Sequence, residues 1–504
     1  MSSARAPHLG RVWWVVLGTL GVAGAISLAF ATGRTQPDQV FLSGCLGLIV
    51  LAVALVVGYV DLAWTVSAAV VLAVFAGNWE HLGLPGFPFL PDRLLLIASL
   101  GAVLLGAPSA AGRPAFRRRA DHWVAALAIA FVTIDAYVAH TLTSNSGLFK
   151  LVDRFGIFPF LLFAVAPIVY PTAHHRRILL GFLVGLGAYL GLTALFTVTG
   201  TSGLVFPRYI LNPNLGLGDL DSTGQAIGRA RGPFLDAVSN GLAMFDCGVA
   251  AALGVVVFRR RWVRLVSAMV VLLSVLGCLF TLQRTVWLAT ILAVLVAMAS
   301  DRRLRRLIVP TGAALAVAVV ASFVLSPTLH ERAVTRFNDH FTVFDRQNLS
   351  AAGVRMLAER PLLGFGWDTF AKKSAPYIIQ SPDYPLTAHG RVIHNTFLSN
   401  AVELGVIGAL LWLVATAMFL LGPLLRRPPP EWRTALVAVV VFWAVTAWLY
   451  PLVLAFPMTF VMLWAGVVDG TAEAVPVTPG GSSSAAADGP TESWPAALGA
   501  ASAR

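Results

Sequence analysis

The sequence predicts an all-α protein, a polytopic helical membrane protein with about 12–14 transmembrane helices. Of the 504 residues, 57% are hydrophobic and only 12% are charged, whereas soluble domains carry about 25% charged residues. Apolar runs close to the roughly twenty residues that a helix needs to cross the hydrocarbon core recur along most of the chain. The mean hydropathy of +0.78 agrees with this class.

Each apolar run is interpreted as one membrane helix. The first run is long and lacks a small-residue cleavage site, so we expect a span there and not a signal peptide. The short third run and the last pair, which Tyr450-Pro451 separates, are also compatible with re-entrant segments. The fourteen runs are 12–32, 39–58, 62–79, 92–108, 123–140, 156–171, 178–199, 236–257, 264–281, 284–300, 307–326, 395–422, 435–450 and 452–468.

Arginines between the runs predict the topology. From a cytoplasmic amino terminus, every second connection should be basic. The later inner connections all are, because they carry Arg113 with Arg117-Arg118-Arg119, Arg176-Arg177, Arg259-Arg260-Arg261 with Arg264, Arg302-Arg303 with Arg305-Arg306, and Arg426-Arg427 with Arg433. This alternation predicts that both termini are cytoplasmic and that the connections 200–235 and 327–394 are extracytoplasmic.

The chain divides into one membrane domain and a tail. We expect residues 1–470 to form a single polytopic domain, with 327–394 as a large extracytoplasmic loop containing short helices before the last membrane helices. Residues 471–504 are rich in Ala, Gly, Ser and Pro and are expected to be a disordered cytoplasmic tail.

The net charge of +12 does not predict a nucleic-acid partner. The positive-inside rule already accounts for the arginines, because they cluster in short connections between spans. Three cysteines, Cys45, Cys247 and Cys278, lie inside apolar runs and are predicted to be buried apolar side chains, without a disulfide or metal role.

A motif-rich stretch follows residue 360. It begins with a Gly-rich turn that contains Gly364, Gly366 and Trp367, and it ends at His394-Asn395, where a long apolar run begins. Two histidines and an arginine, His389, Arg391 and His394, therefore approach the mouth of a membrane helix. Polar groups are costly at such a boundary and usually have a function.

This stretch resembles the carboxy-terminal signature of the O-antigen ligase and O-antigen polymerase family. The shared patterns are Gly-x-Gly-Trp-x-x-Phe from Gly364 and His-Asn-x-x-Leu-x-x-x-x-Glu-x-Gly-x-x-Gly from His394. The resemblance implies a glycosyltransferase of the bacterial inner (cytoplasmic) membrane. Its donor would be a glycan linked to undecaprenyl diphosphate, which is a polyprenyl-diphosphate carrier. Its acceptor would be a hydroxyl group of a glycan or glycolipid on the extracytoplasmic face. It implies no metal and no cofactor.

The resemblance also extends to arginines on the predicted outer side. Arg284 and Trp287 match a Ser-Arg-Gly-x-Trp-Leu-like stretch, although the flanking residues differ. Arg229 lies in an Arg-x-x-Gly-x-Phe pattern, with Arg231 as an additional positive charge. Arg346 resembles a family arginine on the helix before the Gly-rich turn. Snorkelling, interfacial anchoring or a solvated basic face would also account for these positions.

The chemistry of the implied reaction suits these residue types. A diphosphate leaving group carries growing negative charge, which arginine binds through paired hydrogen bonds. An acceptor hydroxyl must lose its proton, and histidine is the commonest general base near neutral pH. We therefore predict His394 and Arg284 as catalytic, with Arg229, Arg231 and Arg346 binding the diphosphate. The predicted supporting residues are His389, Arg391, Asn395, Gly364, Gly366 and Trp367.

The run that begins after His394 is expected to be one continuous helix. Gly405 and Gly408 would then lie near the face of His394 and let another helix pack closely beneath it. Glu403 would lie about half a turn away and about 13 Å deeper, where a lone charge is costly and a partner on another helix is expected.

Three alternatives are open at this point. Asp219-Leu220-Asp221, with Asp236 further along, would be a weak metal site or a solvated acidic turn. A transporter or flippase would need polar groups along a path through the bilayer, and the mid-span ionisable residues are few. The third alternative is a non-catalytic scaffold protein for envelope assembly.

Overall fold

The computed structural model describes residues 60–76, 91–104, 113–142, 147–216, 228–310, 341–379, 392–452 and 456–473, apart from residues 115 and 149, together with isolated positions between these ranges. Every regular element within them is an α-, 3-10 or π-helix, and these ranges contain no strand. The all-α prediction is confirmed for this part of the chain.

Seven of the described helical segments are long and apolar enough to cross a membrane, and three shorter apolar helices accompany them. A polytopic membrane protein is therefore confirmed. The helices of the long segments are α5 (Ala120–Val138), α7 (Ile157–Val169, preceded by a π-helical turn at Lys150–Phe155), α8 (Ala173–Val198), α9 (Ala237–Val257), α10 (Arg261–Phe280), α16 (Thr396–Leu425) and α17 (Pro430–Leu449). The shorter helices include α3 (Leu62–Leu72), α11 (Arg284–Ser300) and α18 (Phe456–Glu473).

Four predicted spans have a different outcome. The runs 12–32 and 39–58 lie outside the described residues, as does most of 307–326. The run 92–108 is described over Pro91–Leu104, which form α4, and its remaining residues lie outside the described ones.

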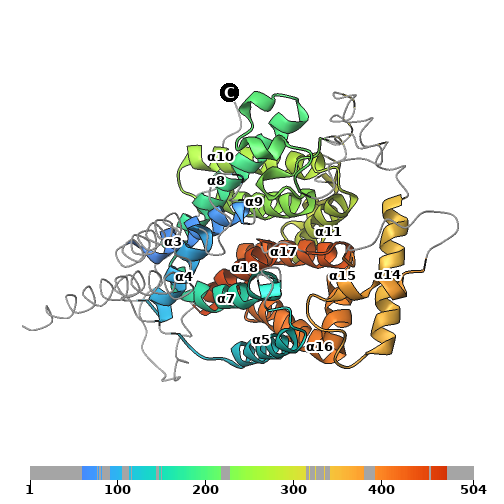
Figure 1. The fold of residues 1–504 in the computed structure, drawn as a ribbon. Helices are drawn as coiled ribbons and strands as arrows, with labels where there is room; N and C mark the ends of the chain where they lie inside the picture. Colours follow the sequence, from blue (N-terminus) through green and yellow to red (C-terminus); the bar gives the residue numbers. More distant parts are fainter. Residues whose placement is uncertain are drawn as a thin grey trace, which may run out of the picture.

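Helix α18 lies at the centre of the bundle, against α7, α16 and α17 (Figure 1). A Cβ atom at Gly466 would lie 2.5 Å from the Phe163 carbonyl oxygen, so only glycine lets α18 and α7 approach this closely. At its start, the Phe456 ring lies 4.7 Å from that of Phe234, and near its end Asp469 pairs with Arg119 and Arg426. Since these contacts lie at opposite ends of the bundle, they favour a full crossing over a re-entrant segment.

The end of the bundle that contains Asp469 gathers the predicted inner connections. The Arg119–Asp469 and Arg426–Asp469 ion pairs join the start of α5 to the ends of α16 and α18. The Arg113 guanidinium lies 2.7 Å from the Asp61 carboxylate, just before α3. Connections that the arginine pattern assigned to the inner side thus lie at the same end of the bundle. That this end faces the cytoplasm stays a prediction.

The predicted outer loop contains α14 (Phe341–Glu359), α15 (Phe370–Lys373) and a 3-10 turn at Ala375–Tyr377. Helix α14 crosses the bundle end opposite Asp469, at the right of Figure 1. Its Leu349 and Met356 form a small core with Ile393 and Val402, so α14 is packed against the entrance of α16.

Helix α16 is broken at Gly405, which has a φ of 66° and a ψ of 179°. The Gly-rich turn, residues 361–370, fills this break. The Phe365 and Gly366 N–H groups donate to the carbonyls of Val402 and Glu403 at 3.0 and 2.8 Å, and the Val406 N–H donates to the Pro361 carbonyl at 2.8 Å. The pairing satisfies backbone groups that the break removes from the helix, as the bilayer interior requires.

The expectation of one continuous helix beneath His394 was therefore wrong. Gly405 receives a loop backbone and not a second helix, because a Cβ atom there would lie 2.1 Å from the Leu362 carbonyl oxygen. Gly364 shows the reciprocal contact, since its Cβ atom would lie 2.5 Å from the Glu403 carbonyl oxygen. Gly408 lies against Phe131 of α5.

Replacing Gly405 with alanine should destabilise the protein. An L-residue at this combination of φ and ψ, which is essentially confined to glycine, costs about 1–3 kcal/mol, and the contact with Leu362 adds to that cost. We expect Gly405→Ala to lower the thermal unfolding midpoint of the purified protein in detergent. Gly422→Ala on the same helix is the matched control, because no atom lies within 4 Å of its Cβ position. Equal midpoints for the two variants would contradict the role of the break.

Candidate functional site

The entrance of α16 is tied to the end of α17. Asn395 is the N-cap of α16, and its side-chain oxygen accepts a hydrogen bond from the Leu398 N–H at 2.9 Å. The Thr396 hydroxyl donates to the Tyr450 carbonyl at 3.2 Å and accepts from the Leu452 N–H at 3.2 Å. These bonds place the His394 ring 6.0 Å from the Tyr450 ring, nearly perpendicular to it.

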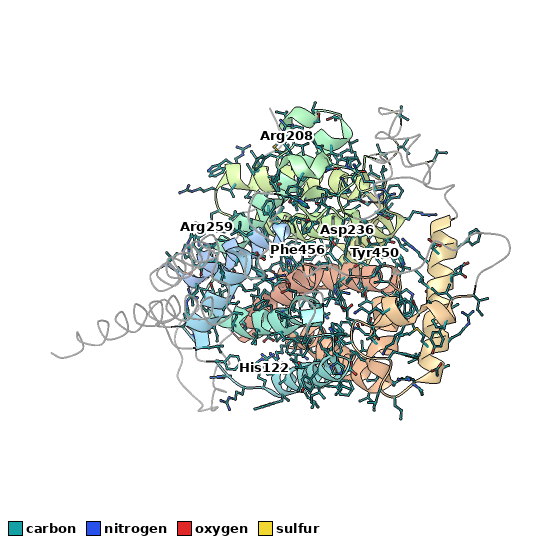
Figure 2. The ribbon with its side chains drawn as sticks, in the orientation of Figure 1. His122, Arg208, Asp236, Arg259, Tyr450 and Phe456 are labelled. Carbon is teal, nitrogen blue, oxygen red and sulfur yellow. The ribbon has the colours of Figure 1, made fainter. Side chains whose placement is uncertain are left out.

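Tyr450 and Asp236, both labelled in Figure 2, form a tyrosine–aspartate pair, and the Tyr450 ring is the one that lies beside His394. The Tyr450 hydroxyl donates to Asp236 Oδ1 at 2.8 Å, while Oδ2 accepts from the Ser239 N–H at 2.9 Å. Asp236 is buried and is the N-cap of α9, which fixes its carboxylate. Desolvation and the Asp236 carboxylate raise the pKa of the Tyr450 phenol well above its usual value, so the phenol keeps its proton and remains the donor.

Two of the predicted arginines act on the same phenol. The positive charges of Arg346 and Arg229 oppose the rise in the pKa of Tyr450. A Coulomb interaction weakens with distance and with intervening water, which favours a position of both guanidinium groups on the Tyr450 side of the bundle. Arg229 is buried, and Arg346 projects from α14, three residues before the Leu349 contact with the α16 entrance.

Arg284 begins α11 and lies next to the Arg229 segment. The Ala230 N–H donates to the Phe280 carbonyl at 3.0 Å, which joins this segment to the end of α10. The Trp287 indole then donates to the Leu279 carbonyl at 3.1 Å and closes the connection between α10 and α11. Arg229 and Arg284 therefore flank one backbone junction, at the bundle end that contains His394.

Arg231 has a different environment from Arg229. It is 2% exposed, and its guanidinium donates to the backbone carbonyls of Leu215, Ile210 and Asn212, the last two at 3.1 and 2.9 Å. Five N–H donors in a planar fork suit this multiple contact. The hydrogen bonds favour a structural role in holding residues 208–216, and the diphosphate role of Arg231 stays a prediction with less support.

Trp367 anchors the Gly-rich turn to the bundle. Its backbone N–H donates to Asp135 of α5 at 2.6 Å, and its indole N–H donates to the Gly147 carbonyl at 3.1 Å. Glu403 accepts from the Asp368 and Phe370 N–H groups at 3.1 and 3.3 Å. Glu403 thus has backbone amides of the Gly-rich turn as partners, one of them at Phe370, the first residue of α15.

Several predicted site residues and part of the possible metal cluster cannot be placed. His389, Arg391, Asp219 and Asp221 lie outside the described residues. Asp236, the remaining member of the possible metal cluster, is engaged with Tyr450 and Ser239. Within the described ranges, no three His, Cys, Asp or Glu side chains gather in a metal-binding arrangement.

Sequence reasoning missed Tyr450 and the role of Asp236. A local signal existed for Asp236, because an aspartate three residues before Ser239 at the start of an apolar run is typical of a helix N-cap. No local pattern indicates its pairing with Tyr450, which lies 214 positions later.

Arg231→Gln should destabilise the protein, because three backbone carbonyls would lose a charged donor. We expect a loss of about 3 kcal/mol, measured as a lower thermal midpoint in detergent. Arg208 is the matched control, since it also donates to two backbone carbonyls, at Ser202 and Gly203, but is exposed to solvent. An Arg231→Gln midpoint no lower than that of Arg208→Gln would show that the carbonyl contacts contribute little.

The comparison with protein families agrees with the signature in the Gly-rich turn. Residues 268–413 match the model of a family described as O-antigen ligase. This segment contains Arg284, Arg346, the Gly-rich turn and His394, while Arg229, Asp236 and Tyr450 lie outside it. No curated protein matches the chain. The match supports, over residues 268–413, the resemblance of this polytopic membrane protein to the O-antigen ligase/polymerase family.

Proposed function

We propose that this protein is a metal-independent glycosyltransferase of the inner (cytoplasmic) membrane. It moves a glycan from an undecaprenyl-diphosphate donor to a hydroxyl of a glycan or glycolipid acceptor on the extracytoplasmic side. The family match supports the general role, which is glycan transfer in polysaccharide assembly at a membrane. The proposal of a diphosphate donor and a hydroxyl acceptor is supported by His394, Arg229 and Arg346, which gather around the Asp236–Tyr450 pair.

The arginines are suited to the diphosphate of the donor. Arg229 and Arg346 lie near the Tyr450 phenol, and Arg284 occupies the first position of α11. Charge-assisted hydrogen bonds from guanidinium to phosphate are about twice as strong as neutral ones. The positive end of the α11 dipole adds to the attraction for an anion. As the bond from the anomeric carbon to the diphosphate breaks, these groups stabilise the charge that grows on the leaving oxygen.

His394 would act on the acceptor. The acceptor hydroxyl attacks the anomeric carbon, its proton passes to the imidazole, and the bonding electron pair leaves with the diphosphate. A single displacement of this kind inverts the anomeric configuration. Tyr450 is proposed as a positioning residue, because Asp236 fixes its phenol and its ring lies against the imidazole.

Contacts of the ionisable residues inside the spans favour an enzyme over a transporter or flippase. Asp135 and Glu403 are bound to backbone amides of the Gly-rich turn. Asp246 is 1% exposed and has no hydrogen-bond partner among the described residues. These three groups therefore do not form a continuous polar path in the described part of the chain.

The acceptor class can be read from a strain that lacks the protein. Shortened surface glycans would assign polymerisation, in which another carrier-linked repeat is the acceptor. Accumulation of full-length, carrier-linked chains would assign ligation to a lipid or glycolipid.

His394→Ala should abolish glycan transfer. Loss of a general base typically costs a factor of about 10²–10⁴ in rate, measured as transfer of a labelled glycan from a lipid-diphosphate donor by the purified protein. His174→Ala is the matched control, because His174 is exposed at the start of α8, at the other end of the bundle. Normal transfer by His394→Ala, at an unchanged protein level, would exclude its role as base. Movement of a labelled carrier across a vesicle without an acceptor would instead support a flippase.

Arg346→Gln should weaken donor binding. Loss of a charge-assisted hydrogen bond of about 1.5–3 kcal/mol corresponds to an increase in the donor KM of about tenfold or more. Arg355→Gln, on the same helix α14 and exposed, should leave this KM unchanged. An equal effect of both substitutions would point to the general charge of α14, and no effect of either would remove Arg346 from the site.

A further inference from the structure

Two adjoining cavities open at the end of the bundle opposite His394. The larger has a volume of about 520 Å³ and lies between α9, α10, α11 and α17. The smaller has a volume of about 450 Å³ and lies where α11 ends and α17 begins. Both cavities are lined by Arg303, Asp301, Pro430 and Thr434, so the two lie side by side.

The larger cavity has apolar walls, and its length along α11 is close to the thickness of one membrane leaflet. Side chains such as Val249, Leu253, Val271 and Val294 line it. It extends from Thr290 of α11 to Asp301, which follows this helix, eleven helical steps that correspond to about 16 Å. This is close to half of the roughly 30 Å hydrocarbon core. The cavity therefore matches an acyl chain that enters from the leaflet on that side.

The smaller cavity is basic. Arg302, Arg303, Arg427 and Arg433 line it. Two carboxylates lie nearby, Asp301 in both cavities and Glu431 in the larger one, so four positive charges face two negative ones. Asp301 accepts the Arg303 backbone N–H at 2.8 Å.

Other arginines at this end of the bundle are already neutralised. Arg119 and Arg426 form ion pairs with Asp469. The ion pairs within the described residues do not include the four arginines of the smaller cavity. Their guanidinium groups are exposed and can bind an added anion.

We propose that this pair of cavities binds one anionic phospholipid. One acyl chain occupies the apolar cavity, and the phosphate headgroup is bound by the arginines. A zwitterionic lipid would match the apolar cavity but not the excess of positive charge, and a soluble anion would match only the arginines. The binding site is separate from the candidate transfer site, because α11 and α17 run the length of the bundle between them. In Figure 2, Arg259 marks this end and Tyr450 the other.

Lipid binding to the purified full-length chain tests this proposal. The protein is delipidated in detergent and titrated with phosphatidylglycerol or phosphatidylethanolamine, and bound lipid is counted by native mass spectrometry. We expect one tightly bound phosphatidylglycerol and weaker binding of phosphatidylethanolamine. The double substitution Arg303→Gln with Arg433→Gln should weaken phosphatidylglycerol binding by about thirtyfold, from the attraction of about 1 kcal/mol that each arginine gives to an anionic lipid.

The matched control removes the same charge elsewhere at this end. Arg259 and Arg306 are exposed and line neither cavity, so Arg259→Gln with Arg306→Gln should bind phosphatidylglycerol as the parent does. Ala252→Trp, at an exposed position of the larger cavity, should displace the acyl chain and weaken both lipids. The double arginine variants should keep the lipid-free thermal midpoint of the parent, which separates lost binding from misfolding.

Three results would overturn the proposal. Equal losses in the two double arginine variants would indicate general surface attraction. Equal affinity for phosphatidylethanolamine would remove the role of charge. Binding of glycerol 3-phosphate as tight as that of phosphatidylglycerol would indicate an anion site that needs no lipid tail.

Discussion

The backbone pairing between residues 361–366 and 402–407 is the constraint on which the arrangement of the site depends. In the bilayer interior every N–H and C=O needs a partner, so a helix can break there only if another segment supplies one. Gly405 and Gly364 permit this approach because neither has a Cβ atom, and a Cβ atom at either would lie within 2.5 Å of a backbone atom. The pairing holds the first half of α16, and it also brings Glu403 to the amides of Asp368 and Phe370. The Gly-rich turn therefore acts by positioning the helix that His394 precedes.

The two ends of the bundle use arginine differently. At one end, Arg119 and Arg426 are neutralised by Asp469, and the ion pairs join helices that are distant in sequence. At the other, Arg229 and Arg346 lie near a phenol whose hydroxyl is bound to the buried Asp236. Because Asp236 also caps α9, its carboxylate is held in place by the helix. The arginines bring positive charge to the end of the bundle that contains His394, as a site for a diphosphate requires.

Much of the fold could be predicted from the sequence, because arginine-rich connections delimit the apolar runs. Residues 284–300 were predicted as a helix and α11 has these bounds. The break at Gly405 could not be predicted, since the segment that stabilises it comes from a loop some forty positions earlier and helical periodicity continues through the glycine. Arg229 and Arg231 are two residues apart and chemically identical, and only the carbonyls of Ile210, Asn212 and Leu215 distinguish them. Local pattern located the candidate site, but tertiary contacts decide which residues hold the structure and which face a substrate.

The central claim is that the end of the bundle containing His394 binds a lipid diphosphate. An experimental structure of the full chain with a polyprenyl-diphosphate analogue that cannot transfer its sugar tests this most directly. The account predicts density for the two phosphates within hydrogen-bonding distance of Arg229 and Arg346, with the anomeric carbon toward the His394 imidazole. Phosphate density at the opposite end, among Arg302, Arg303, Arg427 and Arg433, with none beside Tyr450, would contradict it.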